Sequence, residues 1–107
     1  MNKLLVTVSV LALAVALAVP VKSFAEGSGD VFKAKCAMCH GADGSGNTAM
    51  GKKFGLKDLG SADVQKESDA NIAQIITKGK DKMPAYEGKL TKDQINDLVK
   101  YIRTLKK

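Results

Sequence analysis

Two cysteines and a histidine stand close together in the chain, and they carry its most distinctive chemistry. The segment reads Cys36-Ala37-Met38-Cys39-His40 and contains both cysteines and the single histidine of the 107 residues. A redox-active dithiol of this spacing normally accompanies a β-α-β pattern, which the surrounding sequence lacks. A zinc site needs four ligands, and the chain has only two cysteines and one histidine. A disulfide here would close too short a loop to stabilise the chain much.

The same five residues match Cys-x-x-Cys-His, the attachment motif for c-type haem. Residues i and i+3 share one face of a helix, so the two cysteine sulfurs can reach one edge of a haem. The histidine that follows is then placed to ligate the iron. The sequence therefore predicts one covalently bound haem c, attached through Cys36 and Cys39, with its iron ligated by His40.

The sixth ligand of such an iron decides between an electron carrier and an enzyme or gas sensor. The candidates are Met38, Met50, Met83 and lysine side chains. Met38 lies inside the attachment motif, on the same side as the histidine, and cannot reach across the ring. Met83 precedes Pro84, which restricts the methionine backbone to extended conformations and fixes how the thioether is presented. The residues favour Met83 and leave Met50 or an open site as alternatives.

The first 25 residues have the three-part layout of a secretory signal peptide. A basic start at Lys3 precedes an apolar run of about 16 residues, Pro20 ends that run, and Ala25 offers a small residue at the expected cleavage point. The run is shorter than the ~20 residues that span a bilayer; a retained membrane anchor is the alternative. We expect cleavage after Ala25 and a periplasmic protein. Cleavage would remove Lys3 and Lys22 and lower the formal charge from +6 to +4.

Residues 26–107 predict a single all-α domain. Four helical stretches are expected, at 31–39, at 61–65, from 68 or 69 up to Gly79, and after Thr91. Ser28 or Asp30 is expected to cap the first, a left-handed Gly79 to end the third, and a capping box at 91–94 to open the last. The apolar residues expected to line a haem pocket are Phe54, Leu56, Leu59, Ile75, Ile76 and Leu98.

The whole of 26–107 resembles the class I c-type cytochromes, in particular the small bacterial ones with a single haem. The resemblance rests on the attachment motif, on Met83-Pro84-Ala85-Tyr86, and on a terminal helix that contains Tyr101. It implies the class I cytochrome c fold, with three to four helices around one haem and the first and last helices crossing at Phe32 and Tyr101. It also implies that Met83 is the second axial ligand.

Two positions depart from the family pattern. The family usually has glycine four residues before the crossing phenylalanine, whereas this chain has Ser28 there and Gly29 one place later. A slightly wider crossing or a shifted helix start should follow. The axial histidine of the family often donates a hydrogen bond to a proline carbonyl; here no proline is available, and the carbonyl of Ala49 is the expected acceptor for His40.

These features predict a one-electron carrier, not an enzyme, that shuttles between redox proteins. The alternatives are a membrane-tethered cytochrome and a haem enzyme or gas sensor with a labile sixth ligand. Basic residues outnumber acidic ones 17 to 11, and Lys78, Lys80 and Lys82 lie just before Met83. We therefore expect weak, transient partners with acidic docking surfaces. Export disfavours nucleic acid as a partner, and we expect a monomer without stable membrane insertion.

Overall fold

The computed structural model describes residues 24–107, so residues 1–23 of the predicted signal peptide lie outside the described residues. Helices follow one another along the rest of the chain: α1 (Phe24–Lys35), α2 (Ala37–His40), α3 (Ala49–Phe54), α4 (Ala62–Gln65), α5 (Asp69–Lys78) and α6 (Lys92–Thr104). Residues 24–107 contain no strand, only two isolated β-bridges, and none of their helices is long and apolar enough to cross a bilayer. The all-α prediction is confirmed, with six helices instead of three to four.

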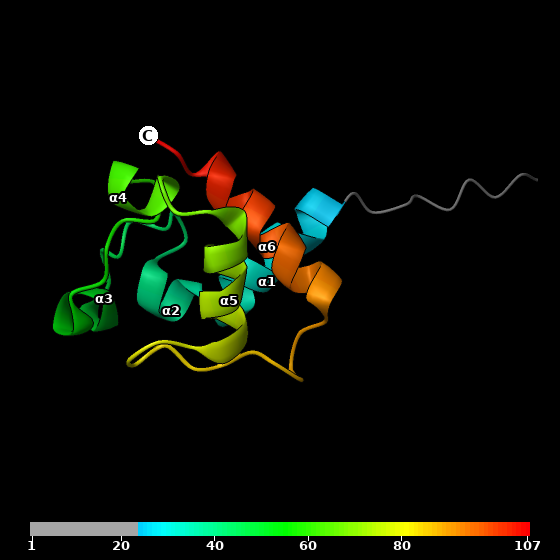
Figure 1. The fold of residues 1–107 in the computed structure, drawn as a ribbon. Helices are drawn as coiled ribbons and strands as arrows, with labels where there is room; N and C mark the ends of the chain where they lie inside the picture. Colours follow the sequence, from blue (N-terminus) through cyan, green and yellow to red (C-terminus); the bar gives the residue numbers. More distant parts are fainter. Residues whose placement is uncertain (1–23) are drawn as a thin grey trace, which may run out of the picture.

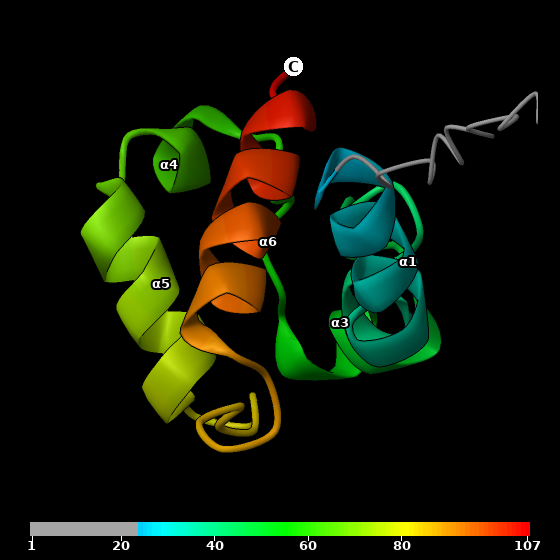
Figure 2. The ribbon, with the colours of Figure 1, turned by 90° about the vertical axis from the view of Figure 1, so that its right-hand side faces the viewer.

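The first and last helices cross, as predicted. Helix α6 lies between α1 and α5 (Figures 1 and 2). At the crossing, the rings of Phe32 and Tyr101 have centroids 5.0 Å apart and an angle of 45° between their planes. Phe32 and Leu98 are each only 1% exposed, so the crossing is also the centre of the core. Burying an apolar side chain of this size contributes about 1.5–3 kcal/mol.

Helix α1 differs from the prediction at both ends. It begins at Phe24, so Ser28 and Asp30 lie inside the helix, and their prediction as caps is wrong. Ser28 is buried instead. The helix also ends at Lys35, because Cys36 leaves regular geometry and serves as the N-cap of α2. The two cysteines of the attachment motif therefore lie on either side of a helix start.

The caps of α5 and α6 follow the sequence prediction. Ser68 Oγ accepts a hydrogen bond from Asn71 N at 3.0 Å and starts α5. Thr91 and Gln94 form the predicted capping box at the start of α6. The apolar stripes of both helices then meet the crossing. The buried core consists of Phe32, Ile72, Ile76, Ile95, Leu98, Val99 and Ile102.

The end of α5 departs from the prediction in one detail. Gly79 caps the helix with φ 75° and ψ 170°, so its φ is positive but it does not adopt the left-handed helical conformation. A Cβ at this position would lie 2.6 Å from the carbonyl oxygen of Met83. The chain therefore needs glycine here for two reasons, its φ and the close approach of the loop that follows.

Arg103, near the end of α6, holds the segment that connects α4 to α5. Its guanidinium donates to Gln65 O at 2.9 Å, to Glu67 O at 2.6 Å and to Asp69 Oδ1 at 2.9 Å. The side-chain amide of Gln65 in turn donates to Leu59 O at 2.7 Å. These bonds fasten residues 59–69 to the C-terminal helix.

Candidate functional site

Two adjoining cavities lie between the helices. The first, about 220 Å³, is bounded by core residues such as Phe32, Ile72 and Leu98 and is called the inner cavity here. The second, about 310 Å³, is bounded by more exposed residues such as Phe54 and Tyr86 and is called the outer cavity. Cofactor sites typically enclose about 300–1,000 Å³. The residues common to both cavities are Cys36, His40, Lys57, Ile75, Lys80 and Met83.

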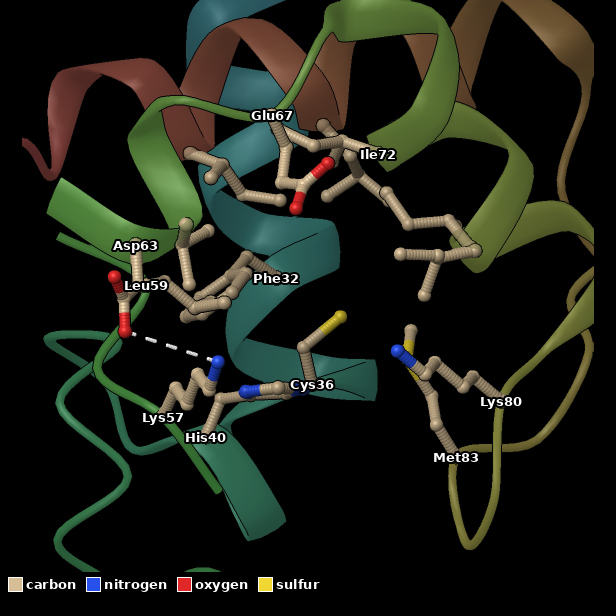
Figure 3. A pocket seen from close by; sticks show the side chains of 15 residues that line it. Phe32, Cys36, His40, Lys57, Leu59, Asp63, Glu67, Ile72, Lys80 and Met83 are labelled. Carbon is tan, nitrogen blue, oxygen red and sulfur yellow. Dashed lines mark ion pairs between the residues drawn. The ribbon is translucent and has the colours of Figure 1, made fainter. Parts of the chain in front are cut away.

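Three of the four predicted site residues therefore border both cavities, and Cys39 borders the outer one. His40 and Met83 lie on opposite sides of the inner cavity, with Cys36 between them (Figure 3). We call residues 32–57, which carry the two cysteines and His40, the attachment side. We call residues 79–90, which carry Met83, the loop side.

The attachment motif is ordered by backbone hydrogen bonds to its own helix. Cys36 N donates to Phe32 O at 2.8 Å, and His40 N donates to Cys36 O at 2.9 Å. The two cysteines form no disulfide. Burial, and then the neighbouring Cys39, raises the pKa of the Cys36 thiol to about 11. Both cysteines border the outer cavity.

His40 is partly buried with an unusual environment. Its Nδ1 is buried and has no hydrogen-bond partner among the described residues, so the predicted bond to Ala49 is wrong. Ala49 is the first residue of α3, and a carbonyl there is directed at the N–H four residues later. Burial lowers the pKa of His40, which favours the neutral imidazole that can ligate a metal.

The loop after the motif folds back on it. Thr48 Oγ1 donates to Cys39 O at 2.6 Å and accepts from Gly51 N at 2.8 Å, which also caps α3. Gly46 N donates to His40 O at 2.7 Å. A Cβ on Gly51 would lie 2.1 Å from Gly46 O and 2.8 Å from Cys39 O. Glycine at position 51 thus allows α3 to pack directly against the carbonyls of the motif.

The loop side presents Met83 from a small backbone hairpin. Lys80 N donates to Met83 O at 3.1 Å, and Met83 N donates to Lys80 O at 2.8 Å. The other methionines of the described part do not border either cavity: Met38 is 79% exposed, and Met50 lies in α3. A thioether can reach the cavities from position 83 alone among the methionines in residues 24–107.

The cavity walls confirm the predicted apolar lining. Leu59, Ile76 and Leu98 border the inner cavity, Phe54 and Leu56 border the outer one, and Ile75 borders both. Sequence reasoning missed further lining residues because their positions depend on how distant helices meet. These residues are Phe32, Val64, Ile72, Ile102, Pro84 and Tyr86.

Comparison with known proteins gives a consistent result. Residues 25–102 match the family described as cytochrome C oxidase, cbb3-type, subunit III. Cytochrome c6 of Leptolyngbya boryana is 37% identical over 78 residues, which cover 73% of this chain and 88% of the relative. Cytochrome c6 of Thermosynechococcus vestitus is 36% identical over 100 residues, covering 89% of this chain and 87% of the relative.

A solved structure agrees with these relatives. The KustC0563 c-type cytochrome superposes with a TM-score of 0.70 at 32% identity, covering 75% of this chain and 98% of that one. The chain belongs to the class I c-type cytochromes. This cytochrome is a monohaem electron-transfer protein with haem c as its cofactor, and it exchanges electrons with redox partners.

The described residues of the cytochrome fit that cofactor. The walls of the inner cavity are largely apolar, and two free cysteines border the outer cavity. A soft thioether, a neutral imidazole and two thiols are the donor set that c-type haem requires.

The outer cavity has a basic rim, which we define as Lys35, Lys57, Lys80 and Lys82. Among residues 24–107, Asp81 is the only acidic residue that borders this cavity. Lys78, predicted to act with Lys80 and Lys82, lies on α5 and forms an ion pair with Glu87 at 2.6 Å. The positive charge next to Met83 therefore comes from a different set of lysines than the sequence run suggests.

Proposed function

We propose that this cytochrome is an exported one-electron carrier whose haem is attached through Cys36 and Cys39 and whose iron is ligated by His40 and Met83. The observation that carries this assignment is the convergence of Cys36, His40 and Met83 on both cavities. When bound, haem supplies a one-electron ferric–ferrous couple. The residues of the chain would hold the haem, keep water away from it and set its reduction potential.

Each side chain has a distinct role in this proposal. The neutral imidazole of His40 and the soft thioether of Met83 would ligate the iron, and the thioether would favour ferrous iron and raise the reduction potential. Ile75 and Leu98 border the inner cavity and would keep water away from the iron. A site with two protein ligands in both oxidation states needs little rearrangement during transfer, which suits a carrier better than a ligand-binding enzyme or sensor.

The basic rim supports the proposal that the redox partners have acidic docking surfaces. Positive charge around the outer cavity would speed the encounter with an anionic surface, and added salt would reduce that gain. Oxidation by ferricyanide, an anion, can be compared with oxidation by tris(phenanthroline)cobalt(III), a cation. We expect rising ionic strength to slow the first reaction and accelerate the second. The double variant K80E/K82E should weaken both trends, whereas K100E on α6 should change them less.

For the N-terminal segment we propose that residues 1–25 are removed on export, which leaves a periplasmic domain of residues 26–107 that functions as a monomer. The layout of residues 1–25 supports this proposal. Mass spectrometry of the protein recovered from an exporting host should give residues 26–107 plus one haem. Recovery of the full-length chain in the membrane fraction would favour the tethered alternative. Light scattering should give the mass of a monomer, and the mass of a dimer would contradict this part of the proposal.

The axial ligands are tested by optical spectroscopy of the haem-loaded protein. A weak sulfur-to-iron charge-transfer band at the red end of the spectrum reports methionine ligation in the ferric state. We expect Met83→Ala to abolish this band and Met50→Ala to preserve it. A wild-type protein that lacks the band and binds carbon monoxide readily would instead have an open sixth position, as in an enzyme or a gas sensor.

A further inference from the structure

Tyr86 connects the two sides of the site. Its hydroxyl donates a hydrogen bond of 3.0 Å to the backbone carbonyl of Lys35, the last residue of α1 and the residue before Cys36. Its own backbone N–H donates to Ile76 O at 3.1 Å in α5. The backbone of Tyr86 is therefore bonded to α5, and its hydroxyl is bonded to the attachment side. Its ring borders the outer cavity between them.

The remaining hydrogen bonds of the loop side do not cross the cavity. Residues 79–90 bond to one another or to the end of α5, as in Glu87 N to Thr77 O at 3.0 Å. The ion pair between Lys78 and Glu87 also joins the loop to α5. Among the described hydrogen bonds of residues 79–90, the Tyr86 hydroxyl alone reaches the attachment side.

Because Tyr86 lies close to Met83 in the chain, the bond from the Tyr86 hydroxyl to Lys35 affects where Met83 lies. Only Pro84 and Ala85 separate the two residues, and Met83 and Tyr86 both pack against the core. A displacement of Tyr86 away from Lys35 would move the methionine away from the attachment side. The backbone hairpin at residues 80–83 would not oppose this movement, because its bonds are internal to the loop.

We propose that Tyr86 is a positioning residue: its hydroxyl holds the loop side at a fixed spacing from the attachment side and thereby keeps the Met83 thioether on the haem iron. This proposal rests on the ligation by Met83 proposed above. Without the hydroxyl, the loop spends more time detached, and an added ligand competes more successfully for the sixth position. A partly exposed hydrogen bond of this kind changes such an equilibrium modestly.

The chain offers a matched control for this effect. Tyr101, the other tyrosine of the chain, packs its ring on Phe32, and its hydroxyl forms no hydrogen bond among the described residues. Tyr86→Phe and Tyr101→Phe therefore make the same chemical change, and only the first removes a bond across the cavity.

The experiment titrates the ferric, haem-loaded full chain with imidazole and follows the loss of the sulfur-to-iron band. We expect Tyr86→Phe to raise the apparent affinity for imidazole by about 2- to 10-fold, the equivalent of about 0.4–1.4 kcal/mol. Tyr101→Phe should leave this affinity unchanged. A purely structural role for Tyr86 would lower the unfolding midpoint without changing imidazole affinity, and that result would overturn the proposal.

Two further measurements separate the possible failures. If Met83→Ala neither removes the band nor tightens imidazole binding, ligation by Met83 is wrong and the proposed function fails with it. If Met83→Ala does both and Tyr86→Phe does neither, the role of Tyr86 alone is wrong. In wild-type protein, the Tyr86 hydroxyl proton should exchange slowly with water by NMR. Rapid exchange would count against the bond independently of any variant.

Discussion

The attachment side and the loop side are built on different principles. On the attachment side, residues close in sequence surround the motif: the carbonyls of Cys39 and His40 accept from Thr48 Oγ1 and Gly46 N. Helix α1 behind the motif is packed into the crossing with α6. On the loop side, Met83 sits on a short segment whose bonds lead to α5, with a single hydroxyl link across the cavity.

This difference predicts that attachment and sixth-ligand binding can be broken separately. Damage to the attachment side should reduce folding and haem loading, because that framework is part of the core. Damage to the loop side should leave the haem attached and change only the occupancy of the sixth position. Regions with few buried contacts open at lower free energy than the core does, so the loop side should also be the first part of the domain to unfold locally.

The largest effect is expected from Gly51→Ala on the attachment side. The new Cβ would lie 2.1 Å from Gly46 O and 2.8 Å from Cys39 O, and these are backbone atoms that cannot move aside locally. We expect a loss of about 3 kcal/mol in the free energy of unfolding and a low yield of haem-loaded protein. Denaturant titration and the haem-to-protein absorbance ratio measure the two outcomes.

Gly55→Ala is the control for this substitution. Gly55 follows the same helix, and a Cβ there would meet no atom within 4 Å, although its φ is +65°. Only backbone strain should act, at a cost of about 1 kcal/mol. Equal losses in the two variants would show that the contact of Gly51 with the motif carbonyls contributes nothing.

A smaller effect is expected from Arg103→Gln, which frees the segment leading into α5. Arg103 donates to Gln65 O, Glu67 O and Asp69 Oδ1 from a side chain that is 29% exposed. Hydrogen bonds from a charged donor contribute about 1.5–3 kcal/mol, so we expect a loss of about 2 kcal/mol in denaturant unfolding. Lys100→Gln, in the same helix, removes a charge without a described ion pair and should cost much less. Similar midpoints for both variants would contradict this role.

The attachment side was the more predictable half of the site. Cys36, Cys39 and His40 are contiguous enough that one local motif identifies them, and the capping signals of α5 and α6 are equally local. Helix α3 escaped prediction because its six residues are too short to show an apolar period. The N-terminal caps failed because α1 starts before the first polar cap candidates.

The contacts that join the two sides could not be read from the sequence. Tyr86 and Lys35 are 51 positions apart, and Arg103 and Gln65 are 38 apart. No periodicity or spacing rule pairs such residues, because their proximity results from the packing of whole helices. For the same reason, Lys78 could not be separated from Lys80 and Lys82 before the ion pair with Glu87 was seen.

On the loop side, Gly79→Ala should produce a smaller loss of stability and a larger spectral change. Its Cβ would lie 2.6 Å from Met83 O and 2.9 Å from Ala85 N at a φ of +75°. We expect a cost of about 1–2 kcal/mol and a weakened sulfur-to-iron band, with the haem still attached. Gly88→Ala, at φ +78° and with no atom within 4 Å, should preserve the band. An intact band in Gly79→Ala would mean that the loop tolerates this displacement.

The smallest effect concerns the acid sensitivity of the loop that follows α3. Asp58 Oδ2 lies 2.5 Å from Lys107 Nζ, and its Oδ1 accepts from Gly60 N at 2.8 Å. The hydrogen bond from Lys107, and then that from Gly60, lowers the pKa of Asp58. Because the pKa of this carboxyl is lower in the folded state, its ionisation stabilises the folded state at pH values above the unfolded pKa of about 3.9. This stabilisation is lost as the pH falls through the folded-state pKa. We therefore expect the stability advantage of wild type over Asp58→Asn to be constant above about pH 5 and to shrink towards pH 3.

Lys107→Gln should behave like Asp58→Asn, and Lys106→Gln like wild type. Parallel curves of unfolding free energy against pH for all four proteins would show that this ion pair contributes nothing to the acid sensitivity, and the sulfur-to-iron band should not respond to any of these substitutions.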